Sequence, residues 1–194
     1  MDSPVLSLIT SFIALTLIAV SYFVKKKELY LFYQLSGIVF LTLSYFFGLQ
    51  FFAMVGLGIS VIRSLTYFLF ERKDKTAPLY FAFVFSLVTI ASYFIVNIWI
   101  LKKAELIDIL LLVACCLYAF IFRIRDLKMV RFTMLVPTIL SVFYNAFSGA
   151  ALFVTLSYAF ELTANVVSIF KYHIIGVHKD YTKEIPKENE YETN

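Results

Sequence analysis

Long apolar segments separated by short polar connections make up most of this chain. Each segment has about 20 residues, the length that an α-helix needs to cross a bilayer. Two connections, Gly48–Gln50 and Ser148–Ala150, are short and uncharged, as in turns that join antiparallel helices. The pattern predicts an all-α protein with seven membrane-spanning helices, at about residues 4–24, 29–47, 51–70, 78–101, 106–122, 129–147 and 151–172.

The last apolar segment, ALFVTLSYAFELTANVVSIFKY, carries a stripe of polar residues. Ser157, Glu161, Asn165 and Ser168 are spaced so that an α-helix places them on one face. In a membrane this face must be hidden from lipid, either by another helix or by a cavity that holds water and a ligand. The serines and the asparagine could serve helix packing alone. Glu161 is a candidate functional residue, because a carboxylate at membrane depth is costly.

A second polar stripe lies in the sixth segment, where Thr133, Pro137, Ser141 and Asn145 follow one another at intervals of four residues. An α-helix places them on one face. Pro137 removes a backbone hydrogen bond and allows a kink. Such a kink lines a cavity or acts as a hinge in many helical carriers, and elsewhere it serves packing only. Pro137 is therefore a candidate hinge, and Asn145 a candidate substrate-binding residue.

Arg63 in the third segment is the candidate partner of Glu161. By helical rise, Arg63 lies roughly 10 Å and Glu161 roughly 15 Å from the same end of the bundle, so their depths agree. Arg63 either forms an ion pair with Glu161 or extends its side chain to the lipid headgroups at that end. Glu161 could also take up a proton, which would permit proton-coupled transport.

Composition supports an integral membrane protein. Hydrophobic residues make up 61% of the 194 residues, charged residues make up 15%, and the mean hydropathy is +0.86. An average soluble domain has about 25% charged residues. The net charge of +4 does not indicate nucleic-acid binding, because membrane proteins gather Lys and Arg in cytoplasmic loops. We expect the lipid bilayer as a partner and no nucleic acid, and the sequence leaves a homo-oligomer open.

Lys and Arg are distributed unevenly over the two sides of the predicted bundle. This bias predicts an N-terminus outside and a C-terminus in the cytoplasm. The tail, residues 174–194, mixes Lys and Glu and is expected to be disordered. The basic side holds Lys25–Lys27, Arg72–Lys75, Arg123–Arg131 and Lys171, whereas the other side holds Lys102 and Lys103.

The sequence contains no arrangement typical of an enzyme or a metal site. Cys115 and Cys116 are adjacent and read as small hydrophobic residues, not as a disulfide. His173 and His178 are five residues apart and do not share a helix face. There is no catalytic pair in an apolar segment and no glycine-rich phosphate loop. We expect no enzymatic activity, no metal and no cofactor.

Spans two and three resemble spans six and seven. In each pair the first helix ends in an aromatic and small-residue turn, and the second ends in a Ser-x-x-basic step, Ser60 to Arg63 and Ser168 to Lys171. We therefore predict two three-helix repeats, about residues 4–71 and 106–172, joined by a linker helix at about 78–101. An odd helix between them is required for both repeats to have the same orientation.

The blocks QLSGIVFLTLSYFFGLQFFAMVGLGISVIRSL and FTMLVPTILSVFYNAFSGAALFVTLSYAFELTANVVSIFK resemble the two halves of the YgjV family of bacterial inner-membrane proteins. That family often has an Asn-x-x-Arg step at the end of each unit. It is in turn similar to SWEET, PQ-loop and nicotinamide-riboside-type carriers with three-one-three helices. The resemblance implies the bacterial cytoplasmic membrane and a small-solute carrier.

Two functions are open at this point. The first is transport of a small polar solute by alternating access between the repeats. The second is a non-transporting accessory or sensor protein, whose polar faces only assemble helices. The candidate substrate-binding residues for the first are Ser60, Arg63, Asn145, Glu161, Asn165 and Ser168.

Overall fold

The computed structural model describes residues 3–48, 51–100, 102, 105–148 and 152–174. Within them the chain is helical and contains no strand, as the apolar pattern predicts. The helices are α1 (Ser3–Ser21), α2 (Lys27–Phe47), α3 (Phe51–Arg72), α4 (Leu79–Tyr93), α5 (Asp108–Ile121), α6 (Leu127–Phe147) and α7 (Leu152–Ile169). Two π-helical extensions follow α4 and α7, η1 (Phe94–Ile100) and η2 (Phe170–Ile174).

The predicted segments match these helices closely. Each helix begins and ends within a few residues of the predicted span, because the runs of apolar residues end at charged or turn residues. The last turns of the fourth and seventh predicted spans are π-helical and continue α4 and α7. The predicted tail lies outside the described residues. Four helices of the described chain, α2, α3, α4 with η1, and α6, are long and apolar enough to cross a membrane, and α1 and α5 are shorter apolar helices.

The surface and the interior are reversed relative to a water-soluble protein. Large apolar side chains cover the outside, with Phe12, Leu87 and Phe147 among the most exposed. The interior holds charged and amide side chains, and Arg63 and Arg131 are each only 1% exposed. Such a surface fits lipid, where apolar side chains lose nothing by exposure and polar groups must be satisfied internally.

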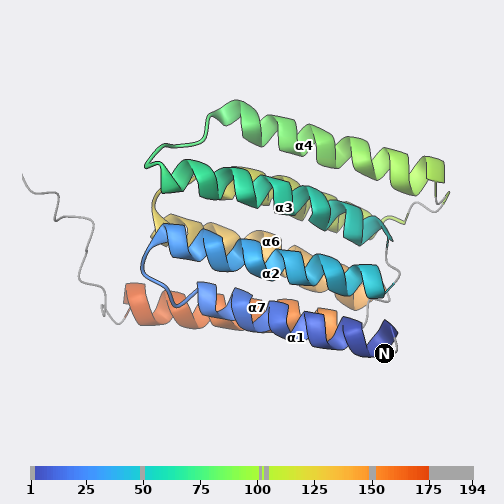
Figure 1. Ribbon diagram of the computed structural model, residues 1–194, viewed down its shortest axis with the longest axis horizontal. Helices are drawn as coiled ribbons and strands as arrows, with labels where there is room; N and C mark the ends of the chain where they lie inside the picture. The colour runs from blue at the N-terminus through green and yellow to red at the C-terminus, as the bar shows by residue number, and fades with distance from the viewer. Residues whose placement is uncertain (1–2, 49–50, 101, 103–104, 149–151, 175–194) are drawn as a thin grey trace, which may run out of the picture.

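Six helices form a closed ring of contacts. α2 packs between α1 and α3, α6 packs between α5 and α7, and the ring closes through the contacts of α1 with α7 and of α3 with α5. α4 packs against α3 and α5 from outside, and it lies at the edge of the bundle (Figure 1). Trp99 in η1, at the far end of this outer helix, is 82% exposed.

α1 and α2 make a close contact at Gly37. Gly37 of α2 faces Ile18 and Ala14 of α1, and a Cβ atom built on Gly37 would lie 2.4 Å from Cγ1 of Ile18. A real side chain at this position would therefore push the two helices apart. On the same pair of helices, Ser7 and Ser44 exchange hydrogen bonds between their hydroxyl groups and backbone carbonyls.

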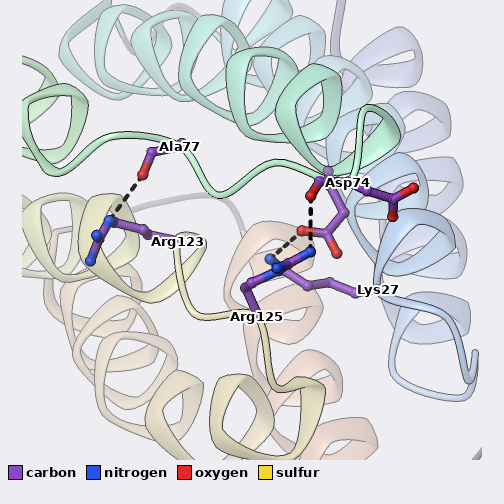
Figure 2. A network of polar contacts seen from close by, with 6 residues as sticks. Lys27, Asp74, Ala77, Arg123 and Arg125 are labelled. Carbon is purple, nitrogen blue, oxygen red and sulfur yellow. Dashed lines mark hydrogen bonds and ion pairs between the residues drawn. The ribbon is translucent and has the colours of Figure 1, made fainter. Parts of the chain in front are cut away.

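A polar network ties the helices at the end of the bundle where α1 ends and α2 begins. We call this the basic end, because it carries the Lys and Arg clusters. Lys27 forms an ion pair with Glu71 at 2.6 Å. Arg123 donates to the carbonyl of Ala77 at 3.0 Å and Arg125 to that of Asp74 at 3.1 Å (Figure 2). These bonds join the α5–α6 connection to the α3–α4 connection.

Candidate functional site

A cavity of about 30 Å³ lies at the centre of the ring and is lined by all six of its helices. One buried water needs about 10–15 Å³, so this space admits one or two waters and no larger solute without helix movement. Both of the charged residues that the sequence singles out line it. The polar lining residues are Gln34, Ser60, Arg63, Tyr118, Ser141, Tyr158 and Glu161.

Arg63 reaches the cavity from α3 and is held by α5. Its Nη1 donates to the carbonyl of Cys115 at 2.7 Å, and its Nη2 donates to Oγ of Ser60 at 3.1 Å. The guanidinium carbon lies 5.6 Å from the ring centre of Tyr118 and 5.7 Å from that of Phe122, within the range of cation–π attraction. The Nε atom is buried and has no hydrogen-bond acceptor.

Both alternatives predicted for Arg63 were wrong. The side chain does not extend to the lipid headgroups, because it is buried at 1% exposure and turns toward the carbonyl of Cys115. It also forms no ion pair with Glu161, although both residues belong to the described part of the chain. Similar depth along two helices does not bring two side chains into contact. Here a cavity lies where the contact was expected.

Glu161 reaches the cavity from α7 and is bound by α1. Its Oε1 accepts a hydrogen bond from the hydroxyl of Tyr22 at 2.8 Å, and the side chain is 4% exposed. The hydrogen bond fixes the carboxyl group at the contact between α1 and α7. The prediction that Glu161 is hidden from lipid on an inward face is confirmed.

The other polar lining groups already have partners within the protein. Ser60 donates to the carbonyl of Gly56 at 3.0 Å, Ser141 donates to that of Pro137 at 2.9 Å, and Gln34 donates to Oγ of Ser21 at 2.9 Å. These groups therefore shape the wall more than they offer free hydrogen bonds to a solute.

Three of the predicted substrate-binding residues do not line the cavity. Asn145 accepts from the hydroxyl of Tyr45 at 2.7 Å and donates to the carbonyl of Ser141 at 2.7 Å. Asn165 donates to the carbonyl of Arg131 at 2.9 Å. Ser168 donates to the carbonyl of Asn165 at 2.8 Å. All three are buried, as the polar stripes predict, but they connect helices or bond to their own helix.

The candidate hinge residue, Pro137, is buried in α6, which continues through it without a break from Leu127 to Phe147. The carbonyl of Pro137 accepts the hydroxyl of Ser141, which lines the cavity one turn later. Pro137 is thus placed next to the cavity wall. Its role as a hinge stays a prediction.

Sequence reasoning missed the aromatic residues of the site. Tyr118, Tyr158 and Tyr22 contribute a ring over Arg63, a part of the cavity wall and the hydrogen bond to Glu161, respectively. They were not separable from the many aromatic residues that face lipid. Tyr118 lies one helical turn from Cys115 on α5, and Tyr158 lies one helical turn from Glu161 on α7. For these two tyrosines, this spacing was the signal that the sequence contained.

The described residues contain no group of three His, Cys, Asp or Glu side chains that could hold a metal ion. Cys115 and Cys116 are free thiols, and Cys115 lines the cavity as a small apolar residue. The predicted absence of a site at His173 and His178 falls on side chains outside the described residues.

Comparison with known proteins gives one match. No curated protein and no solved structure matches the chain. The family model named Imp-YgjV, described as a bacterial inner membrane protein, matches residues 5–174, which include every described helix after the first turn of α1. The apolar surface, the helices of membrane-spanning length and this match agree. The chain therefore belongs to the Imp-YgjV family of bacterial inner membrane proteins.

Proposed function

We propose that this protein is a carrier that moves a small polar solute across the bacterial inner membrane by alternating access. One observation carries the proposal: the cavity is central, is lined by all six helices of the ring, and contains a buried cation and a buried carboxyl group that are not paired with each other. Ionisable groups at membrane depth are costly and mark solute or ion pathways.

Two three-helix repeats are supported by the order of buried positions. The pattern of buried and exposed residues from 21 to 48 recurs almost unchanged from 121 to 148. In α3 and α7 the same pattern recurs at an offset of 101, which pairs the buried residues 53, 56, 57, 60, 63, 64 and 67 with 154, 157, 158, 161, 164, 165 and 168. This register pairs Ser60 with Glu161, whereas the Ser-x-x-basic motif alone pairs Ser60 with Ser168.

The helix contacts also fit two parallel repeats. In this scheme the contact of α1 with α7 corresponds to the contact of α5 with α3, and α4 is the linker outside the ring. Tyr45 and Asn145, which occupy the same place in the two repeats, hydrogen-bond to each other. A pair of equivalent residues can meet in this way only close to the axis that relates the repeats. A central site at such an axis is a known transporter plan, and we include in the proposal that this protein shares it with SWEET and PQ-loop carriers.

In this proposal all seven helices cross the membrane, and the basic end faces the cytoplasm. Hydrogen bonds join helices on both sides of the cavity along the bundle. Tyr45 and Asn145 join α2 to α6 near the ends of these helices that lie opposite the basic end. Toward the basic end, Tyr67 donates to the carbonyl of Ala119 at 2.6 Å, joining α3 to α5. Transport then requires these two layers to open in turn.

The test is labelling of single cysteines by a membrane-impermeant thiol reagent, added from each side, in a protein that lacks Cys115 and Cys116. Cysteines at Ser60 and Ser141, which line the cavity, should be labelled from at least one side. Cysteines at Asn165 and Ser168, buried but outside the cavity, are the matched controls and should stay protected. Protection at all four positions in folded protein would contradict a water-accessible pathway.

The second candidate is an accessory or sensor protein that does not transport. It is favoured by the hydrogen bonds of Asn145 with Tyr45 and of Asn165 with Arg131, which join helices as such a protein requires. Uniform protection in the labelling experiment would support it. Labelling at Ser60 and Ser141 would exclude the fully dry interior that it needs.

A further inference from the structure

We propose that the solute, received when helix movement enlarges the central cavity, is a small zwitterion with an apolar body, of the α-amino-acid type. Its carboxylate lies toward Arg63 and its ammonium group toward Glu161. This inference rests on the proposed carrier function, and it adds the chemical class of the solute.

The position for the carboxylate follows from the unpaired charge of Arg63. A guanidinium group keeps its proton in proteins, so Arg63 carries a full positive charge. No carboxylate of the described residues forms an ion pair with it. Two of its nitrogens bond to a carbonyl and a hydroxyl group, and its Nε–H is buried without an acceptor. A buried cation with a free donor, on a cavity wall, is suited to receive an anionic group.

The position for the ammonium group follows from Glu161. Its carboxyl group lines the same cavity, and the bond from Tyr22 occupies one of its oxygens. A solute with only a negative charge would be repelled by Glu161, and a solute with only a positive charge would be repelled by Arg63. A zwitterion pairs with both groups. It thereby supplies the counter-charges that the two residues do not give each other.

The rest of the wall suits a sugar-like solute less well. A polyol needs many free donors and acceptors, but the hydroxyl hydrogens of Ser60 and Ser141 and one amide hydrogen of Gln34 are already donated within the protein. Between the charged groups the wall is apolar and suits a hydrocarbon side chain. This part of the lining is formed by Ile18, Ile38, Leu41, Leu57, Leu111 and Phe122.

The experiment measures equilibrium binding of tritiated alanine, valine and leucine to the full chain in lipid nanodiscs. Each amino acid is compared with the analogue that lacks its amino group (propionate, isovalerate, 4-methylpentanoate) and the analogue that lacks its carboxylate (ethylamine, isobutylamine, isopentylamine). We expect saturable binding of at least one amino acid and at least tenfold weaker binding of both of its analogues. The proposal is overturned if none of the three amino acids binds, or if an analogue binds as tightly.

The variant E161Q tests whether the ammonium group of the solute lies toward Glu161 and its carboxylate toward Arg63. Without the carboxylate, the preference for the amino acid over its deaminated analogue should fall from at least tenfold to about one, because the analogue is no longer repelled. A misfolded protein would lose both ligands and could not produce this change in ratio. The matched control is E28Q, at an exposed glutamate on α2 outside the cavity, which should keep the original ratio. An unchanged ratio in E161Q would overturn the assignment.

Uptake of the same amino acids into proteoliposomes distinguishes the proposed carrier function from the proposed zwitterion site. Selective binding without uptake would leave the zwitterion site standing and refute the carrier function. Labelling of the Ser60 and Ser141 cysteines together with no amino-acid binding would leave a water-accessible pathway and refute the zwitterion.

Discussion

The two halves of the cavity wall occupy equivalent positions but differ in chemistry. Ile18 and Leu41 of the first three helices lie 100 residues before Tyr118 and Ser141 of the last three, and Leu57 corresponds to Tyr158 in the register of buried positions. A fourth pair sets Ser60 against Glu161. At each of these four pairs the second half carries the more polar side chain.

The first half also supplies the cation of the cavity, Arg63. Its equivalent in α7 is Ala164, which lies outside the cavity lining. Each half therefore supplies one charge to the cavity, from positions one helical turn apart in the repeat. Equivalent backbones constrain which residues point inward, whereas the residue types at those positions differ between the halves. A symmetric scaffold with an asymmetric wall can hold an asymmetric solute in one orientation.

The largest expected effect comes from removing the charge of one half. In R63M the hydrogen bonds of the guanidinium group to the carbonyl of Cys115 and to Ser60 are lost, and we expect a loss of roughly 3 kcal/mol in the free energy of unfolding. The double variant R63M/E161M should recover at least about 1 kcal/mol of the sum of the single losses, because it leaves no lone charge. Unfolding by SDS in mixed micelles measures these values. Strict additivity would show that the two charges are independent.

The next effect concerns the contact of α1 with α2, where Gly37 corresponds to Pro137 in α6. In G37A the added methyl group would lie 2.4 Å from Cγ1 of Ile18, so we expect a loss of about 1–3 kcal/mol from overpacking. Gly58 of α3 is the matched control, because a Cβ atom there meets nothing within 4 Å. G58A should be neutral or stabilising by about 0.5–1 kcal/mol. The same unfolding assay compares them, and equal losses would contradict the close contact.

The smallest expected loss of stability concerns the hydrogen bond that joins the two halves, between Tyr45 and Asn145. Y45F removes the hydroxyl that donates to Asn145, and we expect a loss of about 0.6 kcal/mol, typical of a hydrogen bond between membrane helices. The same change should increase thiol labelling of a cysteine at Ser141 from the end opposite the basic end. Y33F, at a tyrosine of the same helix that is only partly buried, is the control. Unchanged labelling in Y45F would show that this bond does not close the cavity.

The helices and their inward faces could be predicted from the sequence. Helix bounds follow from the lengths of the apolar segments, and every member of the stripe from Ser157 to Ser168 is buried. What each inward residue contacts could not be predicted. Glu161 and Asn165 are four residues apart on one face, yet Glu161 lines the cavity and Asn165 bonds to the carbonyl of Arg131 on α6. Their difference depends on the positions of neighbouring helices, which periodicity within one helix does not contain.

The alignment of the two repeats also could not be predicted from the sequence alone. The motif that pairs Ser60 with Ser168 uses residue identity, whereas the pairing of Ser60 with Glu161 follows from burial. Serine is common in apolar helices, so matching residue identities gave an alignment that differs from the one based on burial. The positions that pack inward carry more information about the repeat than the residues that occupy them.

The place of the single tryptophan has a spectroscopic consequence. Trp99 lies on η1, beyond the end of the outer helix, and is 82% exposed. All indole fluorescence of the chain therefore comes from one known point on its surface. Quenching by lipids brominated at successive depths of the acyl chain would measure how far this point lies from the bilayer centre. Trp99 therefore reports the depth of η1 in the bilayer without any added label.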